Sequence, residues 1–257
     1  MRQGRTTRVD LFATCIVDQL FPDVGVSVVR VLRRLGVEVG YPEGQTCCGQ
    51  ALYNSGYRRE AREMAVRTLG EFGDSEYVVV PSGSCAAMMR VFYLDLFEDE
   101  PEMLRRAVAM SHRVYEFSEF LVKVLGANDT AESESGISGG FKGQGSAAFH
   151  HGCHLLREME VRDEPRALLG AVEGLEVREL RDAETCCGFG GSFSVKLPHI
   201  SEGMLADKVA SVRESGADTL VSCDMSCLMH IGGALRREDP DIKIRHIAQV
   251  LDEGSRG

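Results

Sequence analysis

The feature that most constrains this sequence is an internal duplication marked by cysteines. The segment from Val9 to Leu125 aligns with the segment from Ala147 to Leu251, and each contains one Cys-Cys-Gly triplet. The matched cysteines are Cys15, Cys47, Cys48 and Cys85 in the first copy and Cys153, Cys186, Cys187 and Cys227 in the second. A repeat on this scale predicts two related structural modules rather than one continuous fold.

The spacing of the cysteines supports the alignment. Cys15 and Cys47 are separated by 31 residues, and their counterparts by 32; the next intervals are 36 and 39 residues. Between the copies lies NDTAESESGISGGFKGQGS, which is rich in Gly and Ser and poor in apolar residues. We therefore predict a first module at 1–130, a linker or hairpin at 131–146 and a second module at 147–257.

Short apolar runs of strand length alternate with amphipathic stretches of helical length in both copies. VDLFA, VEVGY, YVVV and TLVS are typical of strands, whereas SVVRVLRRL, REAREMAVRTLGEF and PHISEGMLADKVASVRESG are typical of helices. This alternation predicts an α/β protein with two pseudo-symmetric modules, each a small parallel sheet flanked by helices. The cysteines follow the strands, so we expect the sulfur atoms of each half to gather at the carboxyl edge of its sheet.

Composition narrows the classes of function. The formal charge of −10 disfavours binding to nucleic acid or to anionic lipid, and no apolar run reaches the ~20 residues of a membrane span. The amino-terminal sequence lacks the apolar core of a signal peptide, so we expect a cytoplasmic protein. Nine cysteines in a reducing compartment indicate metal ligands or catalytic thiols rather than disulfides.

Four thiolates in each half suit either zinc or an iron–sulfur cluster. Structural zinc sites usually use two short-spaced cysteine hooks, which neither half contains. Adjacent cysteines suit a cluster better, because their side chains point apart and can bind different irons. Three functions stay open on the residues alone: a redox protein with two clusters, a zinc-binding structural or scaffold module, and a thiol/disulfide reductase that uses a vicinal cysteine pair.

The flanking sequences resemble a known family. TCIVDQLFPDVG, YPEGQTCCGQALYNSGY, VVPSGSC, ETCCGFGGSFSVK and CLMHIGG are similar to segments of the lactate utilization protein A family. These are duplicated proteins with cysteine-rich CCG domains, and they are related to the CCG-domain component of heterodisulfide reductase and to the iron–sulfur component of glycolate oxidase.

The resemblance implies an electron-transfer protein with two [4Fe–4S] clusters, cubane or non-cubane. It would belong to a multi-protein system that oxidises L-lactate, a 2-hydroxy acid, to pyruvate. This chain would then be a non-autonomous subunit of that oxidoreductase, with a ferredoxin-like iron–sulfur protein and a smaller companion as partners.

The sequence departs from the fullest pattern of this family, which ends each module in CxxC. Ser82 and Asp224 occupy the first position of that motif, and only Cys85 and Cys227 remain. Cys223 lies one residue early, so it is either a replacement ligand or a buried thiol at a strand end. We do not expect Ser82 or Asp224 to act as oxygen ligands.

Several other residues invite a functional interpretation. His150, His151 and His154 flank Cys153, which makes them candidates for cluster neighbours or proton shuttles; of the two interpretations we favour outer hydrogen bonds or a position at the surface. Asn54 and Tyr57 are candidates for lining a substrate pocket, although no spacing supports them. The glycines of GFGGS are expected to let backbone N–H groups approach sulfur, not to bind a dinucleotide. No residue is predicted to be catalytic, and no cofactor-binding residue is predicted beyond the metal ligands.

Overall fold

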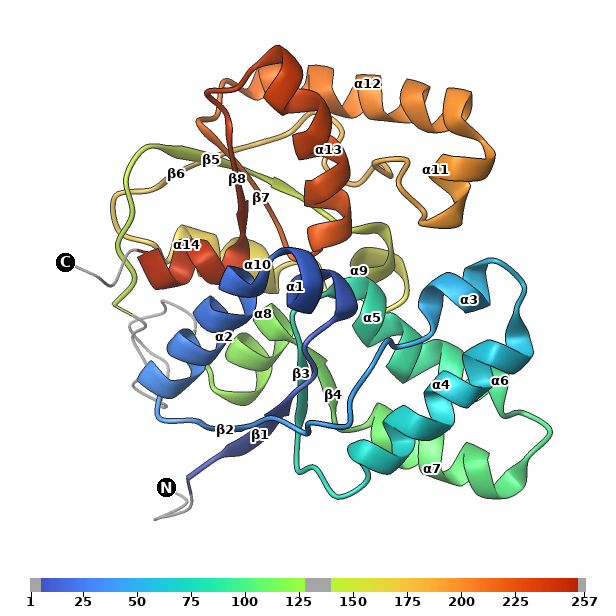
Figure 1. Ribbon diagram of the computed structural model, residues 1–257. Helices are drawn as coiled ribbons and strands as arrows, with labels where there is room; N and C mark the ends of the chain where they lie inside the picture. Colours follow the sequence, from blue (N-terminus) through green and yellow to red (C-terminus); the bar gives the residue numbers. More distant parts are fainter. Residues whose placement is uncertain (1–5, 128–139, 254–257) are drawn as a thin grey trace.

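The computed structural model describes residues 6–127 and 140–253, which form two four-stranded sheets with helices packed around them (Figure 1). The first sheet has the order β2-β1-β3-β4, with β1 Arg8–Leu11, β2 Glu38–Gly40, β3 Val78–Val80 and β4 Val114–Glu116. The second has the order β6-β5-β7-β8, with β5 Ser146–His150, β6 Glu176–Arg178, β7 Thr219–Ser222 and β8 Lys243–His246. Every strand pairing is parallel, so the predicted α/β class with two modules is confirmed.

The helices connect successive strands, as parallel pairing requires. Those of the first half are α1 Cys15–Leu20, α2 Pro22–Arg34, α3 Gln50–Asn54, α4 Arg58–Glu71, α5 Gly83–Ala87, the π-helical η1 Met88–Phe92, α6 Tyr93–Leu96, α7 Pro101–Ser111, α8 Phe117–Glu119 and the π-helical η2 Phe120–Val124. Those of the second half are α9 Cys153–Arg157, α10 Glu164–Gly170, α11 Ser192–Lys196, α12 Pro198–Ser215, α13 Met225–Glu238 and α14 Ile247–Glu253.

Local sequence explains where the main elements begin and end. Proline occupies the first turn of α2 and α12, where its missing N–H costs nothing. Gly216 ends α12 in the left-handed conformation that glycine adopts most easily. All of β3 is buried, as expected for the inner strand of a parallel sheet covered on both faces.

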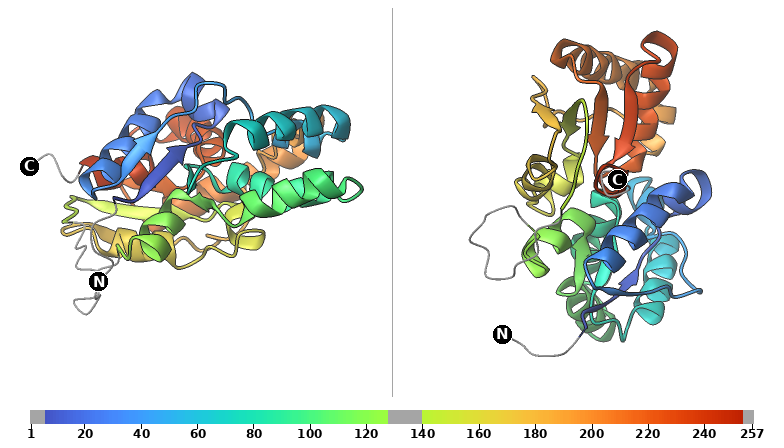
Figure 2. Two further views of the ribbon diagram at one scale, coloured as in Figure 1. Left: turned by 90° about the horizontal axis from the view of Figure 1, so that it is seen from below. Right: turned by 90° about the vertical axis from the view of Figure 1, so that its left-hand side faces the viewer.

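A helix near the end of each half packs against the other half. The carboxyl-terminal α14 of the second half packs against α2 of the first, and α8 of the first half packs against α10 of the second (Figures 1 and 2). Asp252 of α14 is buried and accepts hydrogen bonds from Ser27 at 3.2 Å and from Arg34 at 3.1 Å. Ile247 and Leu251 belong to the same buried apolar cluster as the core of the first half. The halves are thus joined by a common core, which fixes one sheet edge relative to the other.

The predicted boundaries at 1–130, 131–146 and 147–257 remain predictions, and most of the linker lies outside the described residues. Among residues 6–127 and 140–253, every helix is too short or too polar to cross a lipid bilayer.

Candidate metal centre

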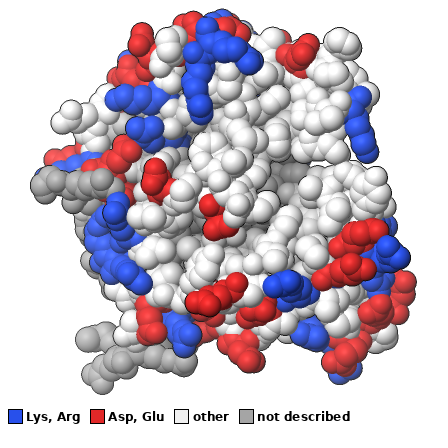
Figure 3. Space-filling view, in the orientation of Figure 1, with Lys and Arg blue, Asp and Glu red and all other residues white. Residues whose placement is uncertain are grey.

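A cavity of about 150 Å³ lies between the halves, and eight cysteines line it. They are Cys15, Cys47, Cys48, Cys85, Cys153, Cys186, Cys187 and Cys227, the eight residues proposed as metal ligands from sequence. Figure 3 shows the hollow between the halves, bordered by a surface with few charged side chains. The structure therefore brings both cysteine sets to one place; whether they bind metal remains a prediction.

The positions of the cysteines follow from the strand–helix connections. Cys15 is the first residue of α1 and Cys153 the first of α9, each shortly after the first strand of its sheet. Cys85 and Cys227 lie in the first turns of α5 and α13, which follow the third strand of each half. Free backbone N–H groups in a first helical turn favour a nearby negative charge such as a thiolate.

The vicinal pairs are positioned by the glycine that follows them. Gly49 and Gly188 adopt φ values of 88° and 85°, a region that other residues rarely occupy. Their N–H groups approach Sγ of Cys47 at 3.4 Å and Sγ of Cys186 at 3.5 Å. This turn directs the first sulfur of each pair toward backbone donors, which is the role expected from sequence for the glycines of GFGGS and therefore for Gly188.

The same pattern of protonation appears in both sets. Hydrogen bonds from Cys15 and Cys48 lower the pKa of Cys47, and Cys15 Sγ lies 3.9 Å from Cys47 Sγ. Hydrogen bonds from Cys153 and Cys187 lower the pKa of Cys186. Each set therefore contains one readily formed thiolate surrounded by thiols that a bound metal would deprotonate.

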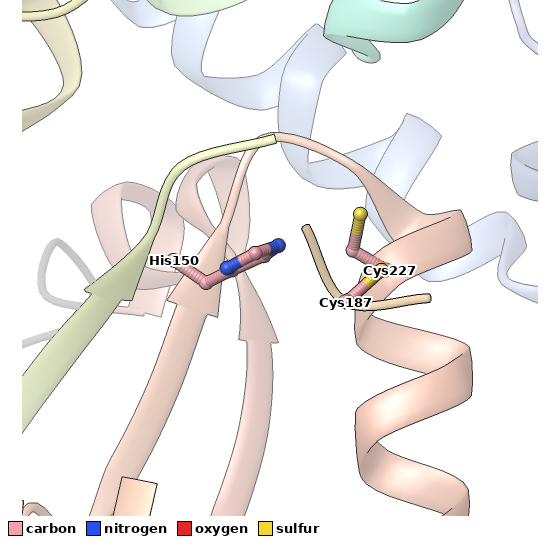
Figure 4. A group of neighbouring side chains, drawn as sticks. All are labelled: His150, Cys187 and Cys227. Carbon is pink, nitrogen blue, oxygen red and sulfur yellow. The ribbon is translucent and has the colours of Figure 1, made fainter. Parts of the chain in front are cut away.

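The second set has an additional donor. The ligand atoms of His150, Cys187 and Cys227 all lie within 4.8 Å of one another, and all three residues are buried (Figure 4). The sequence-based expectation of an outer hydrogen bond or an exposed position is wrong for the side chain of His150, which is 0% exposed and whose two ring nitrogens have no hydrogen-bond partner among the described residues. Alignment of the two copies could have indicated that His150 is buried, because it occupies the place of the apolar Phe12 in the first copy.

The other two histidines have their own contacts. His151 accepts a hydrogen bond from Arg166 at 3.2 Å and packs edge-on against Phe149. His154 lines the cavity, with Nδ1 3.6 Å from Cys153 Sγ. His151 is buried, so the alternative of surface exposure is wrong for it as well.

Ser82 and Asp224, which replace the missing cysteines, bind each other across the two halves. The Ser82 hydroxyl donates to Asp224 Oδ1 at 2.8 Å, while the N–H and hydroxyl of Ser84 donate to the same carboxylate at 3.0 and 2.8 Å. Asp224 precedes α13 but caps α5 of the opposite half, since Ser84 lies in the first turn of α5. The sequence did not reveal this link, which holds the helices of Cys85 and Cys227 together.

Cys223 lies outside the residues that line the cavity. It is fully buried, and its Sγ lies 3.7 Å from the Ser118 hydroxyl. This position favours a buried thiol over a replacement ligand. Of the two pocket candidates, Asn54 lines the cavity, whereas Tyr57 is 57% exposed and does not.

The residues present fit a thiolate-bound metal group. Each half offers four thiols at one cavity with N–H donors beside them, and the described chain pairs none of the nine cysteines in a disulfide. The molecule is thus a duplicated α/β protein with two facing cysteine sets.

Comparison with known proteins agrees with this class. The cysteine-rich domain family (CCG) matches residues 9–90 and 147–232. The chain is 44% identical over 247 residues to lactate utilization protein A 2 of Bacillus cereus (strain AH820), covering 96% of this chain and 98% of that one. It is 46% identical over 245 residues to lactate utilization protein A of Bacillus subtilis (strain 168), covering 95% and 99%. The chain therefore belongs to the lactate utilization protein A family of duplicated CCG-domain proteins.

A crystal structure of a hypothetical protein from Helicobacter pylori shares the fold. It superposes with a TM-score of 0.65 at 9% sequence identity, over 99% of this chain and 50% of that longer one. At this level of identity the similarity concerns the fold alone.

Proposed function

We propose that this chain is an iron–sulfur electron-transfer protein of a multi-protein system that oxidises L-lactate to pyruvate. The observation that carries the proposal is the convergence of two matched sets of four cysteines on one cavity. The names of the relatives supply the substrate, because lactate utilization is what those proteins are named for. A bound [4Fe–4S] cluster supplies one-electron redox chemistry that no amino-acid side chain of this site offers.

The residues of the chain would hold and tune such a group. The N–H groups of Gly49 and Gly188 point at sulfur, and hydrogen bonds to cluster sulfurs are one determinant of reduction potential. Cys48 and Cys187 are each 2% exposed, so water has little access to the inner sulfur of either pair. Because both sets line the same cavity, two bound clusters would lie close enough to exchange electrons directly.

Partners and compartment are part of the same proposal. Electrons from lactate would reach this chain with the help of a ferredoxin-like iron–sulfur protein and a smaller companion. All nine cysteines are free thiols, which suits the reducing cytoplasm.

Purification without oxygen tests the metal content. We expect brown protein that contains iron and acid-labile sulfide in similar amounts and little zinc. The iron should fall when Cys47 and Cys48 are replaced by serine, while Cys223→Ser, a buried cysteine outside the cavity, serves as the matched control. Colourless, iron-free wild-type protein would contradict the proposal.

A second experiment tests the reaction itself. Reduction of the visible chromophore by L-lactate should require the two partner proteins and should fail with this chain alone. Reduction that proceeds equally well without L-lactate would separate the protein from lactate oxidation.

A zinc-binding structural role is the second candidate. It is favoured by His150, Cys187 and Cys227, since a mixed imidazole and thiolate set is common in structural zinc sites. Stoichiometric zinc in place of iron after purification without oxygen would establish it instead.

A further inference from the structure

His150 places an imidazole inside the second cysteine set without any structural partner. It is the last residue of β5, and its side chain is 0% exposed. Neither ring nitrogen has a hydrogen-bond partner within the described chain. Figure 4 shows one ring nitrogen directed toward the sulfur atoms of Cys187 and Cys227. Buried polar atoms in native proteins are nearly always paired, so this orphaned ring indicates a partner that is not a protein atom.

The first half shows that the fold does not need a histidine here. The aligned residue is Phe12, which is also 0% exposed and packs against Phe72 with ring centroids 5.5 Å apart. An aromatic ring of similar shape therefore fills the position. The nitrogen atoms of His150 add polarity that packing alone would not favour.

The surroundings of His150 leave its nitrogen free to bind a metal. The nearby Ala183 carbonyl accepts the His151 N–H at 3.1 Å, and its geometry to the His150 ring falls short of a hydrogen bond. Imidazole nitrogen is a common metal ligand in proteins.

We propose that His150 is a nitrogen ligand of the metal held by the second cysteine set, next to Cys187 and Cys227. Donor atoms on one iron or zinc lie roughly 3.5–4 Å apart, given bonds of about 2.0–2.3 Å. The mutual separations below 4.8 Å require only a small closure of the site. The identity of the metal rests on the proposed function, but the role of His150 does not.

The two centres are then chemically different. The first is bound by thiolates alone, and the second by thiolates and an imidazole. Ligand type is one determinant of the reduction potential of an iron–sulfur centre, so two centres held in this way would differ in potential.

Hyperfine spectroscopy of the reduced protein tests the ligand directly. Wild-type protein labelled with ¹⁵N-histidine and purified without oxygen should show the nitrogen coupling of a direct iron–nitrogen bond. His150→Phe, which installs the residue of the first half, should lose the coupling, and His151→Gln should keep it. An intact cluster without this coupling, or with the coupling retained in His150→Phe, would overturn the proposal.

Cobalt binding to metal-free protein provides a test that does not depend on iron. In a background with Cys47 and Cys48 changed to serine, only the second set is complete. There we expect His150→Phe to weaken Co²⁺ binding by at least about tenfold, and His150→Cys to preserve it. Equal affinity of the background and His150→Phe would overturn the proposal. Absence of iron from the wild-type protein would instead reject the iron–sulfur function and leave the cobalt result to decide on His150.

Discussion

Replacing Gly188 by alanine probes the turn that presents the second cysteine pair. Gly188 has φ of 85°, and a Cβ atom added there would lie 2.8 Å from the Ser201 carbonyl oxygen and 2.9 Å from Met204 Cβ. Both contacts belong to α12, which packs directly against the turn. The side chain therefore meets the backbone of a long helix, which cannot move aside as the end of a flexible side chain can.

The cost has two parts. Forcing a non-glycine residue into the left-handed region costs about 1–2 kcal/mol, and overpacking against a fixed neighbour costs a further ~1–3 kcal/mol. We expect Gly188→Ala to lower the free energy of unfolding by about 2–5 kcal/mol. Gly49→Ala should cost less, about 1–2 kcal/mol, because its Cβ would lie 3.3 Å from the nearest atoms of α4.

Gly203 supplies the matched control, because it lies within α12 and a Cβ there meets no atom within 4 Å. Gly203→Ala should stabilise the protein by up to about 1 kcal/mol through helix propensity. Urea unfolding of the metal-free proteins, followed by circular dichroism, gives all three values. If Gly188→Ala proved as stable as Gly203→Ala, the close packing of the turn on α12 would be refuted.

Three further predictions concern other buried groups. Burial raises the pKa of Glu116 to about 8, so the folded protein favours the neutral carboxyl. The free energy of unfolding that depends on this proton is fully present below about pH 4.5 and is lost as the pH rises through 8. Between pH 5 and 9, the free energy of unfolding of the metal-free protein in urea should fall by about 3–5 kcal/mol more in wild type than in Glu116→Gln. Parallel pH profiles of the two proteins would contradict this. Asp224→Ala removes the acceptor of three hydrogen bonds at 2.8–3.0 Å. We expect it to lower the free energy of unfolding in the same assay by roughly 2–4 kcal/mol. An unchanged urea midpoint would show that the link between the halves does not stabilise the protein. Cys223→Ser should leave the iron content per chain unchanged, and a loss of iron would identify Cys223 as a ligand after all.

Periodicity predicted the principal elements of the fold because they are either long or uniformly apolar. The helix from Pro198 to Gly216 had a proline near its start and a glycine at its end, and the structure places α12 and its cap there. The fourth strands, β4 and β8, were missed because each is short and runs directly into a helix. VYE and KIRH carry too little alternation to separate a strand from the helix that follows.

The relation between the halves could not be predicted from the duplication. Alignment shows which segments correspond, but it does not show that α14 packs on α2 of the other half. The same holds for Asp224 and Ser82, which correspond in sequence and bind each other in space. Duplication predicted two cysteine sets, whereas only the three-dimensional arrangement shows that both face one cavity.

Mössbauer spectroscopy of ⁵⁷Fe-enriched protein tests most directly whether each half holds its own cluster. It should compare wild type with a variant lacking Cys47 and Cys48 and with a variant lacking Cys186 and Cys187. We predict two four-iron centres in wild type and one in each variant, and the spectra of the two variants should differ. Wild-type protein without iron, or loss of all iron when one pair is removed, would contradict it.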